Sequence, residues 1–157
     1  MKKLTLILLS VLLVFTFAAC GGTEETADVF TFKLGETTIV PGEKSDLSKL
    51  PEPDAISEIT SCAFDGVDKV MTYKDKYEIT AHIEGDDAIV YSVFLFDPNL
   101  KTQEGLSMGE TKAKMIEIYG ENFTQDGDGC IYTKGKTQLI MILQDDVIIS
   151  IEYRQVI

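Results

Sequence analysis

Hydrophobic positions follow two different patterns along the 157-residue chain. Residues 4–19, LTLILLSVLLVFTFAA, form one apolar run without a charge. From residue 29 onward, apolar residues recur in short segments that Gly, Pro, Asp and Asn separate. Short apolar segments between such turn residues are typical of β-strands. The pattern therefore predicts an N-terminal targeting segment followed by one strand-rich domain over residues 29–157.

Alternation of apolar and polar residues predicts where the strands lie. In residues 77–84 the odd-numbered side chains, from Tyr77 to Ile83, are apolar and the even-numbered ones are polar, as in a half-buried antiparallel strand. Residues 88–96 are apolar on both faces, which is typical of a central strand. The other expected strands are a hairpin that turns at Leu34-Gly35-Glu36, then residues 69–73, 130–133, 138–143 and 147–153.

Helical spacing predicts one well-defined helix in the second half of the domain. Residues 111–120, TKAKMIEIYG, place Ala113 and Ile116 on one face. Thr111 can cap the N-terminus of this helix, and Gly120 can end it.

Two shorter helical pieces are expected in the first half. Ser45 can cap the first piece and Pro51 ends it. Asp54 can cap the second, which carries Ile56 and Ile59 on one face.

The two halves of the domain resemble each other in sequence. Gly42-Glu43 precedes the first helical region, as Gly109-Glu110 precedes the second. Each region leads into a predicted three-stranded meander. We therefore expect an α+β fold, in which two helix-plus-three-stranded-meander repeats, at about 29–97 and 104–157, form one antiparallel sheet with helices on one face. The N-terminal hairpin precedes these repeats.

The N-terminus has the features of an export signal. Met1-Lys2-Lys3 is a short positive segment, and the sixteen-residue apolar run after it is shorter than the ~20 residues that span a bilayer. Ala18, Ala19 and Cys20 resemble the lipobox of bacterial lipoprotein precursors, although Phe17 stands where Leu is usual. The resemblance implies a signal peptide over residues 1–19 and acylation, such as palmitate, on Cys20.

A lipidated Cys20 predicts where the protein resides. Residues 20–28 are rich in Gly, Thr and acids, so they are expected to form a flexible tether. Several acyl chains anchor a protein far more firmly than one does. The predicted location is the extracytoplasmic face of the cell membrane.

The folded part resembles small Gram-positive lipoproteins of uncharacterised function. The resemblance covers about residues 29–157 and rests on Ser61-Cys62-Ala63-Phe64-Asp65-Gly66, on the run from Glu104-Gly105 to Tyr119-Gly120, and on the closing "SIEY". More distantly, the layout is similar to the beta-lactamase-inhibitor-protein-like fold, which some outer-membrane assembly lipoproteins share. That resemblance implies a protein-binding module that is not an enzyme.

The charge of the chain further limits the classes of partner that it can bind. Acidic residues outnumber basic ones by 26 to 14, and the formal net charge is −12. Nucleic-acid binding requires clustered Lys and Arg, and the sequence has no such cluster. We therefore expect no nucleic-acid partner, and the acidic surface favours a cationic partner or none.

The cysteines offer one covalent possibility. Without Cys20, two cysteines remain, Cys62 and Cys130, and an exported protein can join such a pair in a disulfide. The closed loop would stabilise the fold by about 4 kcal/mol on the chain-entropy model. The alternative is two buried thiols that pack as small hydrophobic side chains.

Other chemistries lack their motifs. Asp126–Gly129 begins like a calcium loop, but Cys130, Ile131 and Thr137 stand where the pattern requires other residues. We therefore interpret this segment as a turn. His82 is the only histidine, lies on the polar face of its strand and is expected at a solvated surface. The sequence predicts no catalytic residue, no cofactor and no metal site.

These observations favour a non-enzymatic lipoprotein that binds a protein partner or associates with the cell envelope. The first alternative is a ligand-binding lipoprotein that serves a transporter or sensor. The second is an enzyme that uses Cys62 with His82.

Overall fold

The computed structural model describes residues 28–157. The signal peptide predicted over residues 1–19, the lipidation of Cys20 and all but the last residue of the tether lie outside this part of the chain. Among the described residues, no helix is long and apolar enough to cross a membrane.

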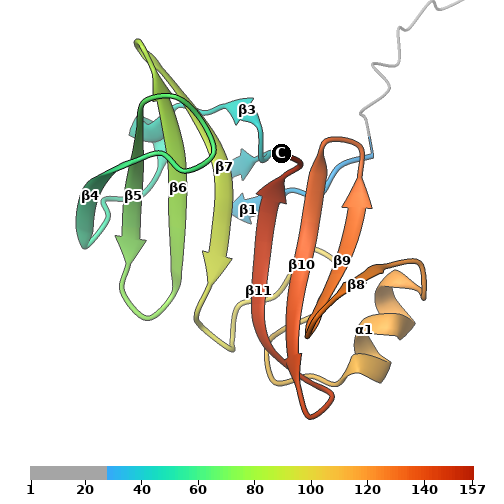
Figure 1. Ribbon diagram of the computed structural model, residues 1–157. Helices are drawn as coiled ribbons and strands as arrows, with labels where there is room; N and C mark the ends of the chain where they lie inside the picture. Colours follow the sequence, from blue (N-terminus) through green and yellow to red (C-terminus); the bar gives the residue numbers. More distant parts are fainter. Residues whose placement is uncertain (1–27) are drawn as a thin grey trace, which may run out of the picture.

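The described residues form a mostly β structure with one α-helix (Figure 1). The first half holds β1 (Phe32–Leu34), β2 (Thr37–Ile39), β3 (Glu43–Lys44), the 3-10 helix η1 (Leu47–Lys49), β4 (Ala55–Thr60), β5 (Val67–Tyr73), β6 (Tyr77–Glu84) and β7 (Asp87–Leu95). The second half holds α1 (Lys112–Tyr119), β8 (Thr124–Asp126), β9 (Gly129–Lys134), β10 (Thr137–Gln144) and β11 (Val147–Gln155).

Nine of these strands form one antiparallel sheet. Its order is β4-β5-β6-β7-β11-β10-β9-β8, and β3 pairs with β7. The sheet contains two meanders, β5-β6-β7 and β9-β10-β11, which join where Ser92 to Leu95 of β7 pair with Ile151 to Arg154 of β11. The prediction that the two meanders share one antiparallel sheet is therefore confirmed. The free edges of the described sheet are β4 and β8 (Figure 1).

One face of the sheet carries the hydrophobic core. The β1–β2 hairpin packs on this face, where the Phe32 ring lies 5.6 Å from Tyr77 and 5.7 Å from Tyr153, measured between ring centroids. Leu106, from the connector after β7, and Met115 of α1 are fully buried in the same cluster. The opposite face, here called the outer face, is turned to the viewer in Figure 1 and carries His82.

The helix predicted over residues 111–120 is confirmed. Thr111 is the N-cap, and its hydroxyl accepts a hydrogen bond from the Lys114 N–H at 3.3 Å. Gly120 has φ = 83° and donates its N–H to the Ile116 carbonyl at 2.8 Å. A glycine adopts this left-handed backbone without the steric cost that a Cβ brings.

The α+β class with helices in both halves is wrong. The first expected helical piece is only the three-residue η1, and its cap is Asp46 rather than Ser45. The second is the strand β4, in which Ile56 and Ile59 fit a helical spacing but pair with β5 instead. β-Branched residues favour strands, and an available neighbouring strand decides the conformation. The fold is therefore mostly β, and the predicted duplicated unit fails because its helix exists in one half only.

The backbone contacts before each meander are nevertheless alike. The Gly42 N–H donates to the Val90 carbonyl of β7 at 2.8 Å, and the Gly109 N–H donates to the Ile148 carbonyl of β11 at 2.8 Å. These are the glycines of the two Gly-Glu pairs that the sequence matched. The resemblance between the halves therefore extends to these contacts and to the meanders, and does not include a helix.

Candidate functional sites: an open sheet edge and a buried histidine

The first candidate site is the free edge of β4. This strand pairs with β5 on one side, from Ala55 opposite Thr72 to Thr60 opposite Val67. Its other side has no neighbouring strand in the described sheet. All six of its residues are exposed. β4 is therefore an unprotected edge strand.

The pairing pattern shows which backbone groups of β4 face outward. The Ser61 N–H donates to the Gly66 carbonyl at 3.0 Å, in continuation of the β4–β5 register. Residues on an antiparallel strand alternate between pointing their N–H and C=O at the partner strand and pointing them away. The N–H and C=O groups of Ile56, Glu58 and Thr60 therefore point away from β5, toward solvent.

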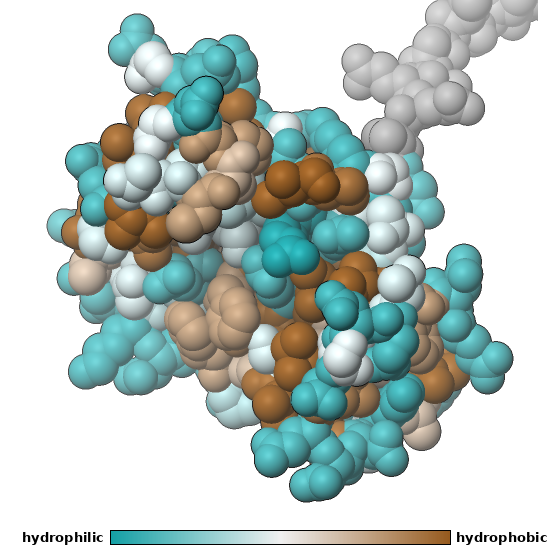
Figure 2. All heavy atoms as spheres, viewed as in Figure 1, coloured by the Kyte–Doolittle hydropathy of each residue, from teal (hydrophilic) through white to brown (hydrophobic). Residues whose placement is uncertain are grey.

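The side chains of β4 do little to shield this edge. Ile56 is 57% exposed and Ile59 is 47% exposed, on opposite faces of the strand. Protected edges commonly carry Lys or Pro, and β4 contains neither. Figure 2 shows apolar residues at the surface over the β4–β7 end of the sheet, interspersed with hydrophilic ones. Glu52, Asp54 and Glu58 are exposed carboxylates in and just before this strand, so the edge is acidic.

The second candidate site lies on the outer face, beneath the loop that links β4 to β5. In this loop, residues 61–66, the Ser61 hydroxyl accepts hydrogen bonds from the N–H groups of Ala63 and Phe64, at 3.3 and 3.0 Å. That turn places the Phe64 ring 4.9 Å from the His82 ring and 5.5 Å from Tyr91. The loop crosses in front of β5 and β6 in Figure 1. The contact of its Phe64 with His82, which is 8% exposed, shows that the loop covers the histidine.

Beneath the loop, Asp68, His82 and Tyr91 form a hydrogen-bonded cluster. Asp68 of β5 is 1% exposed, and its Oδ1 lies 3.0 Å from Nδ1 of His82. The Tyr91 hydroxyl donates to Asp68 Oδ2 at 2.8 Å. A buried carboxylate requires donors on both oxygens, and these two side chains supply them. Burial raises the pKa of Tyr91 well above its usual range, and the hydrogen bond to Asp68 adds to the effect.

The prediction for His82 was right about its face and wrong about its exposure. His82 does lie on the face opposite the core, yet it is only 8% exposed. Residues 61–66 cover it, and no local sequence pattern indicated that this loop would fold back over the sheet. Asp68 and Tyr91 were not predicted as site residues. The signal for Asp68 was its position directly opposite His82 in the β5–β6 register, which follows once the hairpin turn is placed.

A cavity of about 590 Å³ opens beside this cluster. Phe64, Asp65 and Glu84 are among its lining residues, as are His82, Ile89 and Gln155. Its volume lies in the range of small-molecule sites, roughly 300–1,000 Å³. Among the lining residues, His82 is the one polar residue that is buried as a whole, at 8% exposed.

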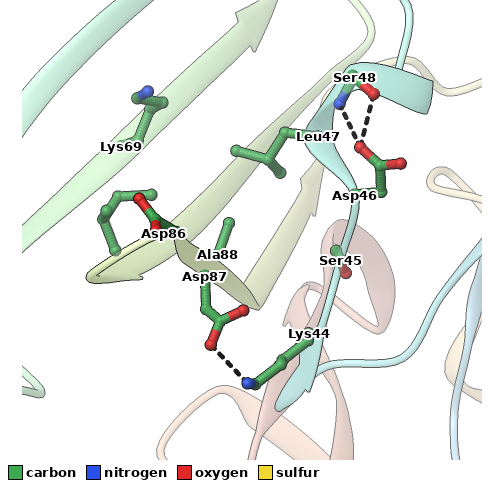
Figure 3. Close-up of a pocket in the computed structure, with 10 residues that line it drawn as sticks. Lys44, Ser45, Asp46, Leu47, Ser48, Lys69, Asp86, Asp87 and Ala88 are labelled. Atoms are coloured by element: carbon green, nitrogen blue, oxygen red, sulfur yellow. Dashed lines mark hydrogen bonds and ion pairs between the residues drawn. The ribbon is translucent and has the colours of Figure 1, made fainter.

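A second hollow of about 550 Å³ lies between η1 and the β6–β7 hairpin (Figure 3). Three of the five charged side chains that line it, Lys44, Asp46 and Asp87, have partners. The Lys44 ammonium donates to the Asp87 carboxylate, and Asp46 accepts hydrogen bonds from both the backbone N–H and the hydroxyl of Ser48. Both carboxylates are substantially exposed. This hollow therefore presents no unsatisfied buried group to a ligand.

Cys62 and Cys130 are free thiols. Cys62 is exposed in the loop after β4, and Cys130 is buried in β9, where its Sγ lies 3.4 Å from Gln125 Oε1. Five strand spacings separate β5 from β9, about 24 Å at ~4.8 Å each, whereas a disulfide requires Cα atoms within about 7 Å. The disulfide is not formed in this structure, and only Cys130 fits the alternative of a buried thiol.

Cys62 and His82 also do not form the hydrogen-bonded pair that a Cys–His enzyme would need. Among the described residues, the hydrogen bond of His82 is to Asp68, and none joins it to Cys62. Within the same part of the chain, no group of three His, Cys, Asp or Glu side chains is placed to hold a metal ion. The segment Asp126–Gly129 forms the tight turn between β8 and β9, with Asp126 opposite Gly129, so the turn interpretation is confirmed.

Comparison with known proteins gave no match to any family model, curated protein or solved structure. The resemblance to small Gram-positive lipoproteins and to the beta-lactamase-inhibitor-protein-like fold therefore stays a prediction.

Proposed function

We propose that this chain is a lipid-anchored, extracytoplasmic binding module that is not an enzyme and that binds a protein partner by strand addition at β4. The observation that carries the proposal is the open edge of β4, with all six residues exposed and three residues whose backbone groups point outward. Strand addition uses such groups for affinity and uses the alternating side chains for specificity.

The chemistry of the edge also describes the partner segment. An added strand would pair with the outward N–H and C=O groups of Ile56, Glu58 and Thr60. It would cover Ile56 on one face and Ile59 on the other, whose exposure in water is unfavourable. Because Glu52, Asp54 and Glu58 make this edge acidic, the matching segment is extended, apolar at alternate positions and positively charged.

The lipobox-like Ala18-Ala19-Cys20 supports a membrane location for this module. An anchored protein meets partners in two dimensions, so a modest strand-addition affinity is sufficient when the partner is also in the envelope. This is why we place the partner among envelope proteins.

A photo-crosslinking residue at position 57 of the full chain, in intact cells, tests the proposal. Position 57 lies in the middle of β4, and the same residue at Thr124, in the opposite edge strand β8, is the matched control. The proposal predicts a discrete protein adduct from position 57 and none from position 124. Equal capture at both positions, or none at position 57, would contradict it.

A further inference from the structure

The outer face has an open half, formed by β7, β11, β10 and β9, that strand addition at β4 does not use. The strand registers place Phe94, Glu152, Ile140 and Ile131 in one row across these four strands. The residues next to them along each strand belong to the core cluster, so the row points to the other side of the sheet. The β1–β2 hairpin and α1 pack on the core face. No described strand or helix therefore covers the open half.

Apolar side chains stand in this open half, where the solvent face of an antiparallel sheet is usually polar. Phe96 follows β7 and is 44% exposed, and its ring lies 5.1 Å from that of Phe94. Ile131 and Ile142 are partly exposed. Figure 2 shows apolar residues at the surface where β7, β11 and β10 lie in Figure 1, with hydrophilic ones between them. Apolar surface of this kind marks an interaction site.

Two charged residues lie in the row of Glu152 and the rows on either side of it, namely Glu152 itself and Arg154. The Glu152 side chain is 19% exposed and lies between Phe94 and Ile140. Its Oε1 accepts the Ser92 hydroxyl at 2.8 Å, whereas its Oε2 lies 3.9 Å from Arg154 Nη1, too far for a hydrogen bond. The Arg154 guanidinium makes no hydrogen bond to the other described residues. Burying either charge alone is costly, so an occupant of this face must bring a cation and an anion.

We propose that the open half binds a second copy of this chain in a twofold-symmetric dimer. A twofold axis repeats every contact. When Arg154 of one copy lies against Glu152 of the other, all four charges are therefore paired. A lipid surface or a purely apolar partner would supply neither counter-charge. The chain has a net charge of −12, yet these rows hold one charge of each sign, so their contact brings no net repulsion.

The size of the open half predicts a weak dimer. Four strands of about five residues cover about 19 by 17 Å, at ~4.8 Å per strand and ~3.4 Å per residue. This is less than the ~800 Å² per partner of a standard interface. A lipid anchor would confine the copies to one surface and raise their effective concentration. The affinity argument thus rests on the proposed anchor, whereas the twofold contact is independent of strand addition at β4.

Two differently tagged forms of the full chain, expressed together in intact cells, test the dimer. A photo-crosslinking residue replaces Phe96 on the open half, and the control replaces the exposed Thr38 of β2, in the hairpin on the core face. We expect an adduct that carries both tags from position 96 and none from position 38. Equal adducts from both positions, no double-tagged adduct from position 96, or capture there of other proteins only would overturn the proposal. Cell fractionation of the same samples reports on the anchor separately.

Charge reversal distinguishes this twofold contact from chance collision of crowded chains. Arg154→Glu alone, or Glu152→Arg alone, places like charges together and should lower the double-tagged adduct by roughly tenfold. Expressed together with one tag each, the two variants restore both ion pairs, so the adduct should return. Better folding cannot explain this return, because the same chains fail separately.

Arg154→Gln removes the charge without adding repulsion and should lower the adduct by a smaller factor. This variant keeps the test valid if circular dichroism finds a reversed chain unfolded. An adduct that is insensitive to all three substitutions, or that folded reversed chains do not restore when mixed, would overturn the twofold contact.

Discussion

Replacing Tyr91 by Phe removes one oxygen atom and so tests how much the hydrogen bond to Asp68 stabilises the buried cluster. The Tyr91 hydroxyl donates to Asp68 Oδ2 at 2.8 Å, and Asp68 is 1% exposed. Phenylalanine keeps the ring that packs against Phe64 and removes only this donor. Hydrogen bonds to a charged group contribute about 1.5–3 kcal/mol. Tyr91→Phe should therefore lower the free energy of unfolding by about 2 kcal/mol.

A second tyrosine provides the matched control. The Tyr132 hydroxyl donates to the Gly120 carbonyl, a neutral acceptor, at 2.7 Å. A bond between neutral groups contributes about 1 kcal/mol, so Tyr132→Phe should cost about half as much as Tyr91→Phe.

Urea unfolding of the full-length chain, followed by circular dichroism, measures both effects. With a slope of about 2 kcal/mol per molar urea, Tyr91→Phe should move the midpoint down by about 1 M. If Tyr91→Phe costs no more than Tyr132→Phe, Asp68 is not a buried carboxylate that depends on this donor, and the reasoning about the cluster is refuted.

Four further predictions concern the rest of the chain. Thr111→Ala should destabilise the fold by about 1 kcal/mol through loss of the α1 cap, while Thr111→Ser should not; equal urea midpoints for the two variants would contradict the cap. A thiol reagent should label Cys62 in the native protein and reach Cys130 only after unfolding, because Cys130 is buried and burial raises the pKa of its thiol; mass spectrometry of each peptide checks this, and rapid native labelling of Cys130 would contradict it. Cys20→Ser should release the protein from membranes into the medium, as cell fractionation would show, and retention would contradict the anchor. Burial raises the pKa of Tyr77 and Tyr132 to about 12, so their contribution to stability is complete below pH ~10 and is lost as the pH rises toward ~12; unfolding midpoints that stay constant from pH 9 to about 11.5 would contradict it.

The sequence predicted well those elements that local patterns determine. Residues 77–84 alternate cleanly, and β6 has these same bounds. Thr111 and Gly120 marked both ends of α1, since capping depends on residues close in the chain. The turn between Asp126 and Gly129 also followed from its composition.

The predictions that failed concern elements whose structure depends on contacts between residues far apart in the chain. Ile56 and Ile59 match a helical spacing, and only pairing with β5 makes their segment a strand. The burial of His82 requires the loop of residues 61–66 to fold over the outer face, which no local pattern encodes. Asp68 and Tyr91 become a pair only through the β5–β6–β7 registers. In the candidate cluster, the sequence predicted the face of His82, and the β5–β6 register could have added Asp68. The contact with Tyr91 and the cover by residues 61–66 were not predictable.

Proline at position 58 tests strand addition most directly. The Glu58 N–H points away from β5, so proline there removes a donor that an added strand would use and spares the β4–β5 hydrogen bonds. Glu58→Ala removes the same carboxylate and keeps the N–H. Each variant carries the photo-crosslinker at position 57 in intact cells. We predict that the adduct persists with Glu58→Ala and is lost with Glu58→Pro; an adduct that survives the proline unchanged would contradict strand addition at β4.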